Sequence, residues 1–155
     1  MNTTLKRALY LDDLRTPTVT LEGYEPFSVV RDYDQFVSHI QTHGIPDLIS
    51  FDHDLADEHM RDWYKHQARG VETISYGEFK EKTGLDCMKW LCNLILDEKE
   101  NGNDVTMPAI RVHSANPMGS QNMLSYASSF CSVMELDADI RYLVVPFVIA
   151  TQVEE

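Results

Sequence analysis

Apolar and polar positions divide this chain into short apolar runs separated by charged or turn-forming segments. The runs that suit buried strands are 5–11, 27–30, 47–51 and 109–112. Runs of this length between turn signals are typical of strands in a parallel sheet that is buried on both faces. The almost wholly apolar stretch from Tyr142 to Ile149 predicts a final strand, and Pro146 places that strand at an edge or a bulge.

Apolar residues at helical spacing predict three helices between these runs. They run from Asp32 or Asp34 to about His43, from Thr83 to about Lys99, and onward from Asn116-Pro117. Thr83 and Asp86 have the spacing of a capping box, and a proline in the first turn is typical of a helix start. Strands that alternate with helices predict an α/β domain with a mostly parallel sheet.

The connections between these elements differ in length. Residues Arg15 to Thr18 have the composition of a turn, and only a loop joins the first two strands. Residues 57–82 combine many charges with aromatic residues and show little apolar periodicity, so we interpret them as a long insertion or lid. No domain boundary is evident, and residues 1–155 suit a single domain.

Composition and charge narrow the cellular setting and the partners. The three cysteines lack metal-ligand spacing and suit buried thiols in a reducing compartment, and no apolar run is long enough to span a membrane. We therefore expect a cytoplasmic protein. The formal net charge of −12 argues against binding to duplex nucleic acid, which requires a basic surface.

Acidic side chains follow two of the predicted strands, at the point where each strand ends. Asp12 and Asp13 follow the first strand, and Asp52 and Asp54 follow the strand at 47–51. The carboxyl ends of parallel strands meet at one edge of a sheet, where ligands bind. Asp12, Asp13 and Asp52 therefore suit a site for Mg²⁺ or Mn²⁺, although aspartates after a strand are also common as solvated turn residues.

Two histidines occupy equivalent positions at the same expected edge. His53 lies between two aspartates, and His113 follows the strand at 109–112. Imidazoles can serve as a general acid and a general base near neutral pH, and Asp54 could orient His53. We expect His53, His113 and Asp54 to be catalytic, with a purely structural role for each histidine as the alternative.

A phosphate group could bind beside these residues. The start of the helix at Asn116 offers backbone N–H groups and a partial positive charge, and Ser114 and Asn116 add polar side chains. Arg15 could clamp two phosphate oxygens. The alternatives are simple helix capping for Asn116 and an exposed ion pair for Arg15.

Four strings give the chain a resemblance to a known family. They are Leu11-Asp12-Asp13-Leu14-Arg15-Thr16-Pro17, Ser50-Phe51-Asp52-His53-Asp54-Leu55, the segment from Lys82 to Leu91, and Val112-His113-Ser114-Ala115-Asn116-Pro117-Met118-Gly119. Together they resemble the cyclic-phosphate-processing receiver-like family, a divergent branch of the response-regulator receivers. The resemblance covers roughly residues 5–130 and implies a receiver-like (flavodoxin-like) three-layer sandwich.

The resemblance also implies an activity on cyclic phosphates. We expect a phosphoesterase that opens the cyclic phosphate of a nucleotide or of an RNA end, and a non-catalytic module that sequesters a phosphorylated nucleotide is the alternative. A receiver that works in a phosphorelay needs a lysine after its last core strand, and no lysine follows Lys99. Ala56 stands where the family favours glycine, which puts the local turn in doubt.

Overall fold

A five-stranded parallel sheet forms the centre of the protein in the computed structural model, which describes residues 4–55 and 82–149. Its strands, in spatial order, are β3 (Ser28–Val30), β1 (Ala8–Leu11), β4 (Leu48–Phe51), β5 (Ala109–Val112) and β6 (Ile140–Tyr142). Each neighbouring pair is parallel. The expected receiver-like α/β class is confirmed.

Three helices follow strands of this sheet, and each begins as the sequence predicts. They are α1 (Tyr33–His43), α3 (Gly84–Glu100) and α4 (Pro117–Met134). The N-cap side chain of Asp32 accepts a hydrogen bond from the first turn of α1, and Asn116 does the same for α4. Thr83 and Asp86 form the reciprocal bonds of a capping box at the start of α3.

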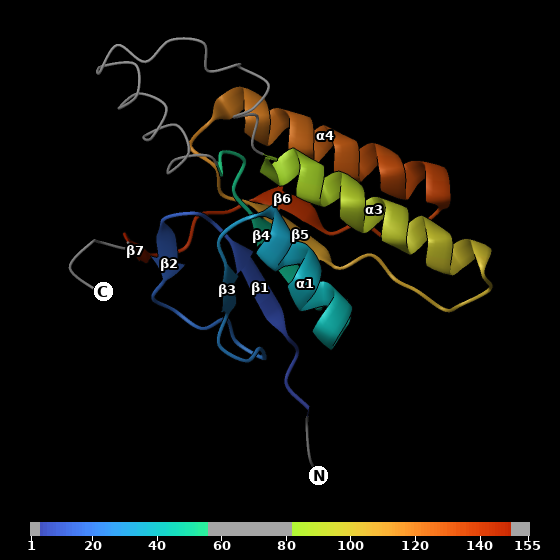
Figure 1. Cartoon of the computed structure of the whole chain (residues 1–155), viewed down its shortest axis with the longest axis horizontal. Helices are drawn as coiled ribbons and strands as arrows, with labels where there is room; N and C mark the ends of the chain where they lie inside the picture. Colours follow the sequence, from blue (N-terminus) through green and yellow to red (C-terminus); the bar gives the residue numbers. More distant parts are fainter. Residues whose placement is uncertain (1–3, 56–81, 150–155) are drawn as a thin grey trace, which may run out of the picture.

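The hydrophobic core lies between one face of the sheet and these three helices. Figure 1 shows α1, α3 and α4 side by side, with the strands behind and below them. Leu9 and Leu11 of β1 belong to this core, whereas Tyr10 between them points to the opposite face because side chains alternate along a strand. The buried helix residues include Phe36 of α1 and Leu91 of α3.

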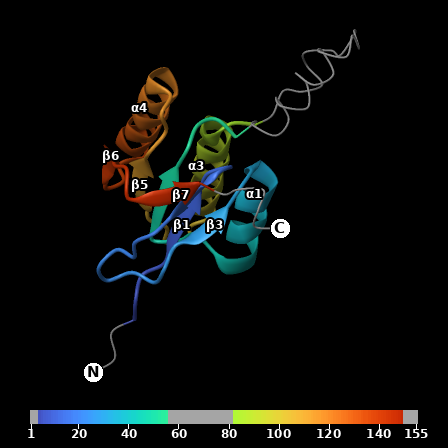
Figure 2. The same ribbon diagram turned by 90° about the vertical axis from the view of Figure 1, so that its left-hand side faces the viewer.

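A small second sheet lies apart from the three helices. Strands β2 (Arg15–Pro17) and β7 (Phe147–Ile149) pair antiparallel, and Figure 2 shows β7 in front of β1. Among the described residues, the third layer of the sandwich consists of this sheet and the connection from β1 to β3. This layer contains no described helix because the connection from β1 to β3 forms β2 instead.

Two sequence predictions are wrong in this region. The segment that begins at Arg15 is a strand rather than a turn, because its backbone finds a partner far along the chain in β7. The tail is not one strand: β6 ends at Tyr142 and β7 begins at Phe147, after Pro146. A proline has no N–H group to donate to a sheet, and the Pro146 carbonyl instead accepts a hydrogen bond from the backbone N–H of Thr18.

The remaining expectations about the chain as a whole have mixed outcomes. All three cysteines, Cys87, Cys92 and Cys131, are buried free thiols, as expected. Within residues 4–55 and 82–149, no helix combines the length and apolarity needed to cross a membrane. The predicted lid at 57–82 lies, apart from Lys82, outside the described residues, and a cytoplasmic location stays a prediction.

Candidate active site at the carboxyl edge of the sheet

Polar side chains from three neighbouring strands meet at the carboxyl edge of the sheet. Asp12 follows β1, Asp52 follows β4 and His113 follows β5. All three are buried, and one ligand atom from each lies within 4.8 Å of the others. The parallel sheet therefore brings these residues together as the sequence predicts.

His113 is held by hydrogen bonds on both sides of its ring. Its Nδ1 atom lies 2.7 Å from Ser50 Oγ, and its Nε2 atom lies 3.0 Å from Asp12 Oδ2. The ring also stacks on Tyr10, with 4.3 Å between the ring centroids. Because the Asp12 carboxylate can only accept, Nε2–H donates to it and Nδ1 accepts from the Ser50 hydroxyl. Burial lowers the pKa of His113, although Asp12 opposes this effect, so the imidazole is neutral.

Asp12 accepts three hydrogen bonds at this edge. Its Oδ1 atom accepts from the backbone N–H groups of Leu14 and Arg15, at 2.8 and 2.7 Å. Burial alone would raise the pKa of Asp12, but the bonds from His113 and from these N–H groups outweigh it and lower the pKa. Asp12 therefore stays ionised and fixes the turn that follows β1.

Asp52 has the opposite electrostatic balance. Burial and the neighbouring charge of Asp12 raise the pKa of Asp52 to about 7, although hydrogen bonds from the backbone N–H of His53 and from Ser114 partly offset them. Two carboxylates this close repel each other unless a proton or a cation lies between them. The site therefore binds a proton near neutral pH in the absence of a cation.

The donor atoms of this edge fit a divalent cation. A carboxylate has about four lone-pair positions, and Asp12 uses three of them for His113 and the two N–H groups. Asp52 Oδ1 accepts one bond, from the backbone of His53. Both aspartates therefore keep oxygen lone pairs of the kind that Mg²⁺ and Mn²⁺ prefer. Asp13, the third predicted ligand, is half-buried and lies outside the cluster of Asp12, Asp52 and His113.

A second group of polar residues lies nearer the surface. His53 Nδ1 is 2.9 Å from Asp54 Oδ1, and Asn116 Nδ2 donates to both oxygens of Asp54 at 3.4 Å. Asp54 is well exposed, and His53 is mostly covered, with 16% of its side chain accessible. Among the described residues, the Nε2 atom of His53 has no hydrogen-bond partner. The structure thus orients this imidazole through one nitrogen only.

Two glycines allow these residues to approach the helices. A side chain at Gly119, in the first turn of α4, would place its Cβ atom 2.5 Å from the His53 ring. A side chain at Gly84, the first residue of α3, would collide with the backbone of Asp52. Since both contacts are shorter than real Cβ atoms allow, each position requires glycine, and His53 packs directly on the amino end of α4.

The predicted phosphate-binding residues all lie at this edge, with part of their bonding capacity already used. Arg15 Nη1 donates to the His113 carbonyl at 3.0 Å, and its guanidinium stacks on Phe147 of β7. Ser114 Oγ accepts from the backbone of Asn116, and Asn116 Oδ1 caps α4. Capping by Asn116 is therefore observed, whereas phosphate binding by Arg15, Ser114 and Asn116 stays a prediction.

Sequence reasoning missed Arg31 and Ser50. Arg31 Nη1 donates to the carbonyls of Asp12 and Arg15, and its Nη2 donates to Thr16 Oγ1, so it ties β3 to the turn after β1. Ser50 gave one usable signal, because it is a polar residue inside an otherwise apolar strand. Arg31 gave none, since its partners depend on the folded loop.

The comparison with known families agrees with this geometry. The family model of the cyclic-phosphate processing receiver domain matches residues 7–129, which include every strand end that contributes to the site. No curated protein and no solved structure matches the chain. The chain therefore belongs to the family of cyclic-phosphate processing receiver domains.

Proposed function

We propose that this protein hydrolyses a cyclic phosphodiester on a nucleotide or an RNA end and opens the ring to a phosphomonoester. The observation that carries this proposal is the His53–Asp54 pair on the amino end of α4. Helix amino ends favour phosphate groups, and an oriented imidazole beside one suits proton transfer at phosphorus. The link of the family to cyclic phosphates supports the same substrate class.

In this reaction a water oxygen forms a bond to phosphorus, and the bond from phosphorus to one ring oxygen breaks. The water loses a proton, and the departing oxygen takes one up to become a hydroxyl group. His53 carries one of these transfers through Nε2, while Asp54 holds Nδ1 and fixes the ring orientation. Asn116 positions Asp54 in turn.

His113 has a different role in this proposal. It is fully buried, and both ring nitrogens are bonded to Ser50 and Asp12. We therefore assign it to holding the Asp12 carboxylate rather than to proton transfer with the substrate. This assignment replaces the expectation from sequence that the two histidines act as a general acid and a general base.

Asp12 and Asp52 would hold a divalent cation at this edge. When bound, Mg²⁺ or Mn²⁺ supplies charge that stabilises the phosphoryl oxygens. Whether Asp12 and Asp52 hold an ion can be tested through the stability of the protein. When the ion is present at about 100 times its dissociation constant, binding adds roughly 2.7 kcal/mol to the free energy of unfolding. We expect Asp12→Asn to abolish most of this gain in thermal melts.

The activity is tested with cyclic nucleotides of both ring types and with RNA ending in a cyclic phosphate, each with Mg²⁺, Mn²⁺ or EDTA. We expect His53→Gln to lower turnover by about 10² to 10⁴-fold and to change ligand affinity by less than about tenfold. His43→Gln, an exposed change on α1, is the matched control. The limb of the pH–rate profile that disappears in His53→Gln identifies the direction of proton transfer. Full activity of this variant would contradict the role of His53.

A second candidate function is binding without turnover. It is favoured by the burial of His113, because among the described residues only the imidazole of His53 is then accessible at this edge. With cyclic substrate in excess over protein, an enzyme forms product beyond one equivalent, whereas a sequestering module retains the substrate unchanged. Saturable binding with no product would therefore replace the phosphoesterase by the binding module.

A further inference from the structure

A cavity lies at the edge of the sheet opposite the candidate active site. It has a volume of about 550 Å³ and is bounded by the end of α1, one side of α3 and the segment that leads into β5. Pro46 and Asp47 precede β4, whereas Asp52 follows it. Because a strand rises about 3.3 Å per residue, Asp47 and Asp52 are separated by about 16 Å along the strand.

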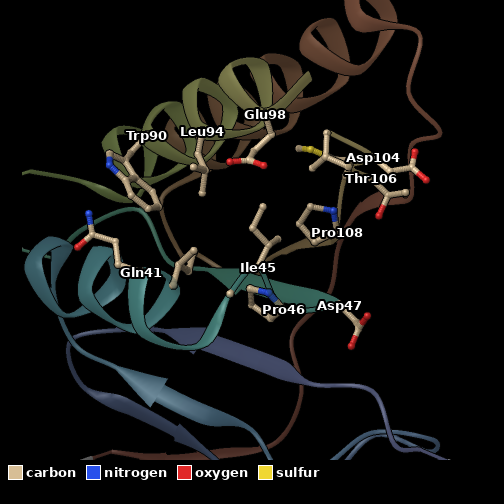
Figure 3. Close-up of a pocket in the computed structure, with 14 residues that line it drawn as sticks. Gln41, Ile45, Pro46, Asp47, Trp90, Leu94, Glu98, Asp104, Thr106 and Pro108 are labelled. Carbon is tan, nitrogen blue, oxygen red and sulfur yellow. The ribbon is translucent and has the colours of Figure 1, made fainter. Parts of the chain in front are cut away.

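Apolar side chains form one part of the lining of this cavity, and polar groups form about as much of it. Figure 3 shows Trp90 and Leu94 extending from α3 toward Ile45 and Pro46. Trp90 and Leu94 lie four residues apart, on one side of α3. Both are only half-buried. Ligand pockets typically have volumes of about 300 to 1,000 Å³ and apolar linings with a few polar groups. This cavity therefore has the size of a small-molecule site, and its apolar part suits a hydrocarbon chain.

The polar groups of the cavity carry negative charge. Three carboxylates line it, those of Asp47, Glu98 and Asp104, and no lysine, arginine or histidine is among the lining residues. Asp47 accepts the backbone N–H of Arg7, and Glu98 accepts the side-chain amide of Asn103. Within the described part of the chain, the lining offers no basic side chain to pair with either of them. Each of the three carboxylates can therefore accept a bond from a cation.

The backbone adds to this negative potential. Gly44, at the carboxyl end of α1, lines the cavity, and Glu98 lies in the last turns of α3. Helix carboxyl ends carry a partial negative charge and favour cations. Arg7 lies close to Gly44 but is not a lining residue, and it donates to the Ile45 carbonyl. Lys99 donates to the Met134 carbonyl.

We propose that this cavity binds a linear aliphatic diamine or polyamine. Its methylene chain would lie on Trp90 and Leu94, and its ammonium groups would pair with Glu98, Asp104 and Asp47. An ammonium group near the Trp90 ring adds a cation–π attraction. The site is separate from the candidate active site, so this proposal does not rest on the proposed phosphoesterase function.

Trp90 provides a direct readout of binding. The chain has two tryptophans, so Trp63→Phe leaves Trp90 as the single indole reporter in the full-length protein. The probes are spermidine and diaminooctane, compared with octanediol of equal chain length and with ethylenediamine, which lacks most of the apolar chain. We expect saturable changes in Trp90 fluorescence with the first two probes and affinities at least about tenfold weaker for the other two.

The charges are tested in a double variant with a matched control. Glu98→Gln with Asp104→Asn removes two cavity carboxylates, and Asp97→Asn with Glu100→Gln removes two exposed ones from the end of the same helix. Each partly exposed charge pair contributes up to about fivefold in affinity, so we expect the cavity variant to weaken spermidine binding about tenfold. The control should change it less than twofold.

Three results would overturn this proposal. Equal weakening in both double variants would mean that amines bind only through the overall negative charge of the protein. Equal affinity for octanediol and diaminooctane would mean that the ammonium groups do not contribute to binding. Equal affinity for ethylenediamine and diaminooctane would mean that the apolar side chains of the cavity do not contribute to binding.

Discussion

The two edges of the central sheet are built in opposite ways. At the carboxyl edge, buried polar groups form a continuous set of hydrogen bonds from Ser50 through His113 to Asp12. At the amino edge, apolar side chains and three carboxylates together line an open cavity. A buried polar group is costly when it loses its partner, whereas a half-exposed group regains water. The carboxyl edge should therefore respond strongly to small changes, and the amino edge weakly.

The largest effect is expected when the hydrogen bonds of His113 are removed and an aromatic ring is kept. His113→Phe keeps a ring beside Tyr10 but leaves the Ser50 hydroxyl and one oxygen of Asp12 without their partner. Each unsatisfied buried group costs about 1 to 3 kcal/mol, so the free energy of unfolding should fall by about 4 kcal/mol. Urea denaturation measures this loss. A loss below about 1 kcal/mol would mean that the edge is less tightly bonded than the distances indicate.

The second effect is a dependence of stability on pH that comes from Asp52. Its pKa is raised to about 7 in the folded protein and is ordinary in the unfolded chain, so the folded state binds more protons between about pH 4 and 7. The free energy of unfolding in EDTA should therefore fall as pH rises through this window, by about 3 kcal/mol. The lowered pKa of Asp12 acts in the opposite direction below about pH 4.

Asp52→Asn isolates this contribution from the other titrating groups. The variant lacks the ionisable proton, so the difference in stability between it and the wild-type protein should change across the same pH window. Above pH 7 in EDTA, the variant should be the more stable protein, because the repulsion from Asp12 is gone. A constant difference from pH 4 to 8 would show that Asp52 titrates normally.

A smaller effect is expected at the other end of the same hydrogen-bonded set. Ser50→Ala removes the donor to His113 Nδ1 and should cost about 1 to 2 kcal/mol. The change should also alter the tautomer balance of His113, which nitrogen chemical shifts of the ring report by NMR. Unchanged ring shifts would mean that Asp12 alone fixes the tautomer.

The smallest effect is expected at the amino edge. Glu98→Gln keeps the shape of a half-buried side chain whose hydrogen-bond partner among the described residues is the amide of Asn103. Its stability should stay within about 0.5 kcal/mol of the wild-type value in the same urea experiment. A cost above about 1.5 kcal/mol would show that this carboxylate is structural and would weaken the contrast between the two edges.

The sequence predicted the parallel sheet and the convergence of its strand ends because both depend on local patterns. Apolar runs locate β1, β4 and β5, and the residue after each run must then lie at the carboxyl edge. The surroundings of those residues were harder to predict, since both histidines follow an apolar run but only the fold buries His113 completely. Strand β2 and the division of the tail into β6 and β7 were missed, because the pairing of β2 with β7 joins residues more than 100 positions apart.

The pairing of β2 with β7 also has a consequence for the order in which the protein folds. The central sheet closes through connections of moderate length, but β2 must wait for a strand near the other end of the chain. Contacts between such distant positions form late because closing a long loop costs entropy. Arg15, which lies in β2 and bonds to the His113 carbonyl, therefore reaches its place only when β7 docks. During synthesis, the candidate site would stay open on that side until β7 has left the ribosome.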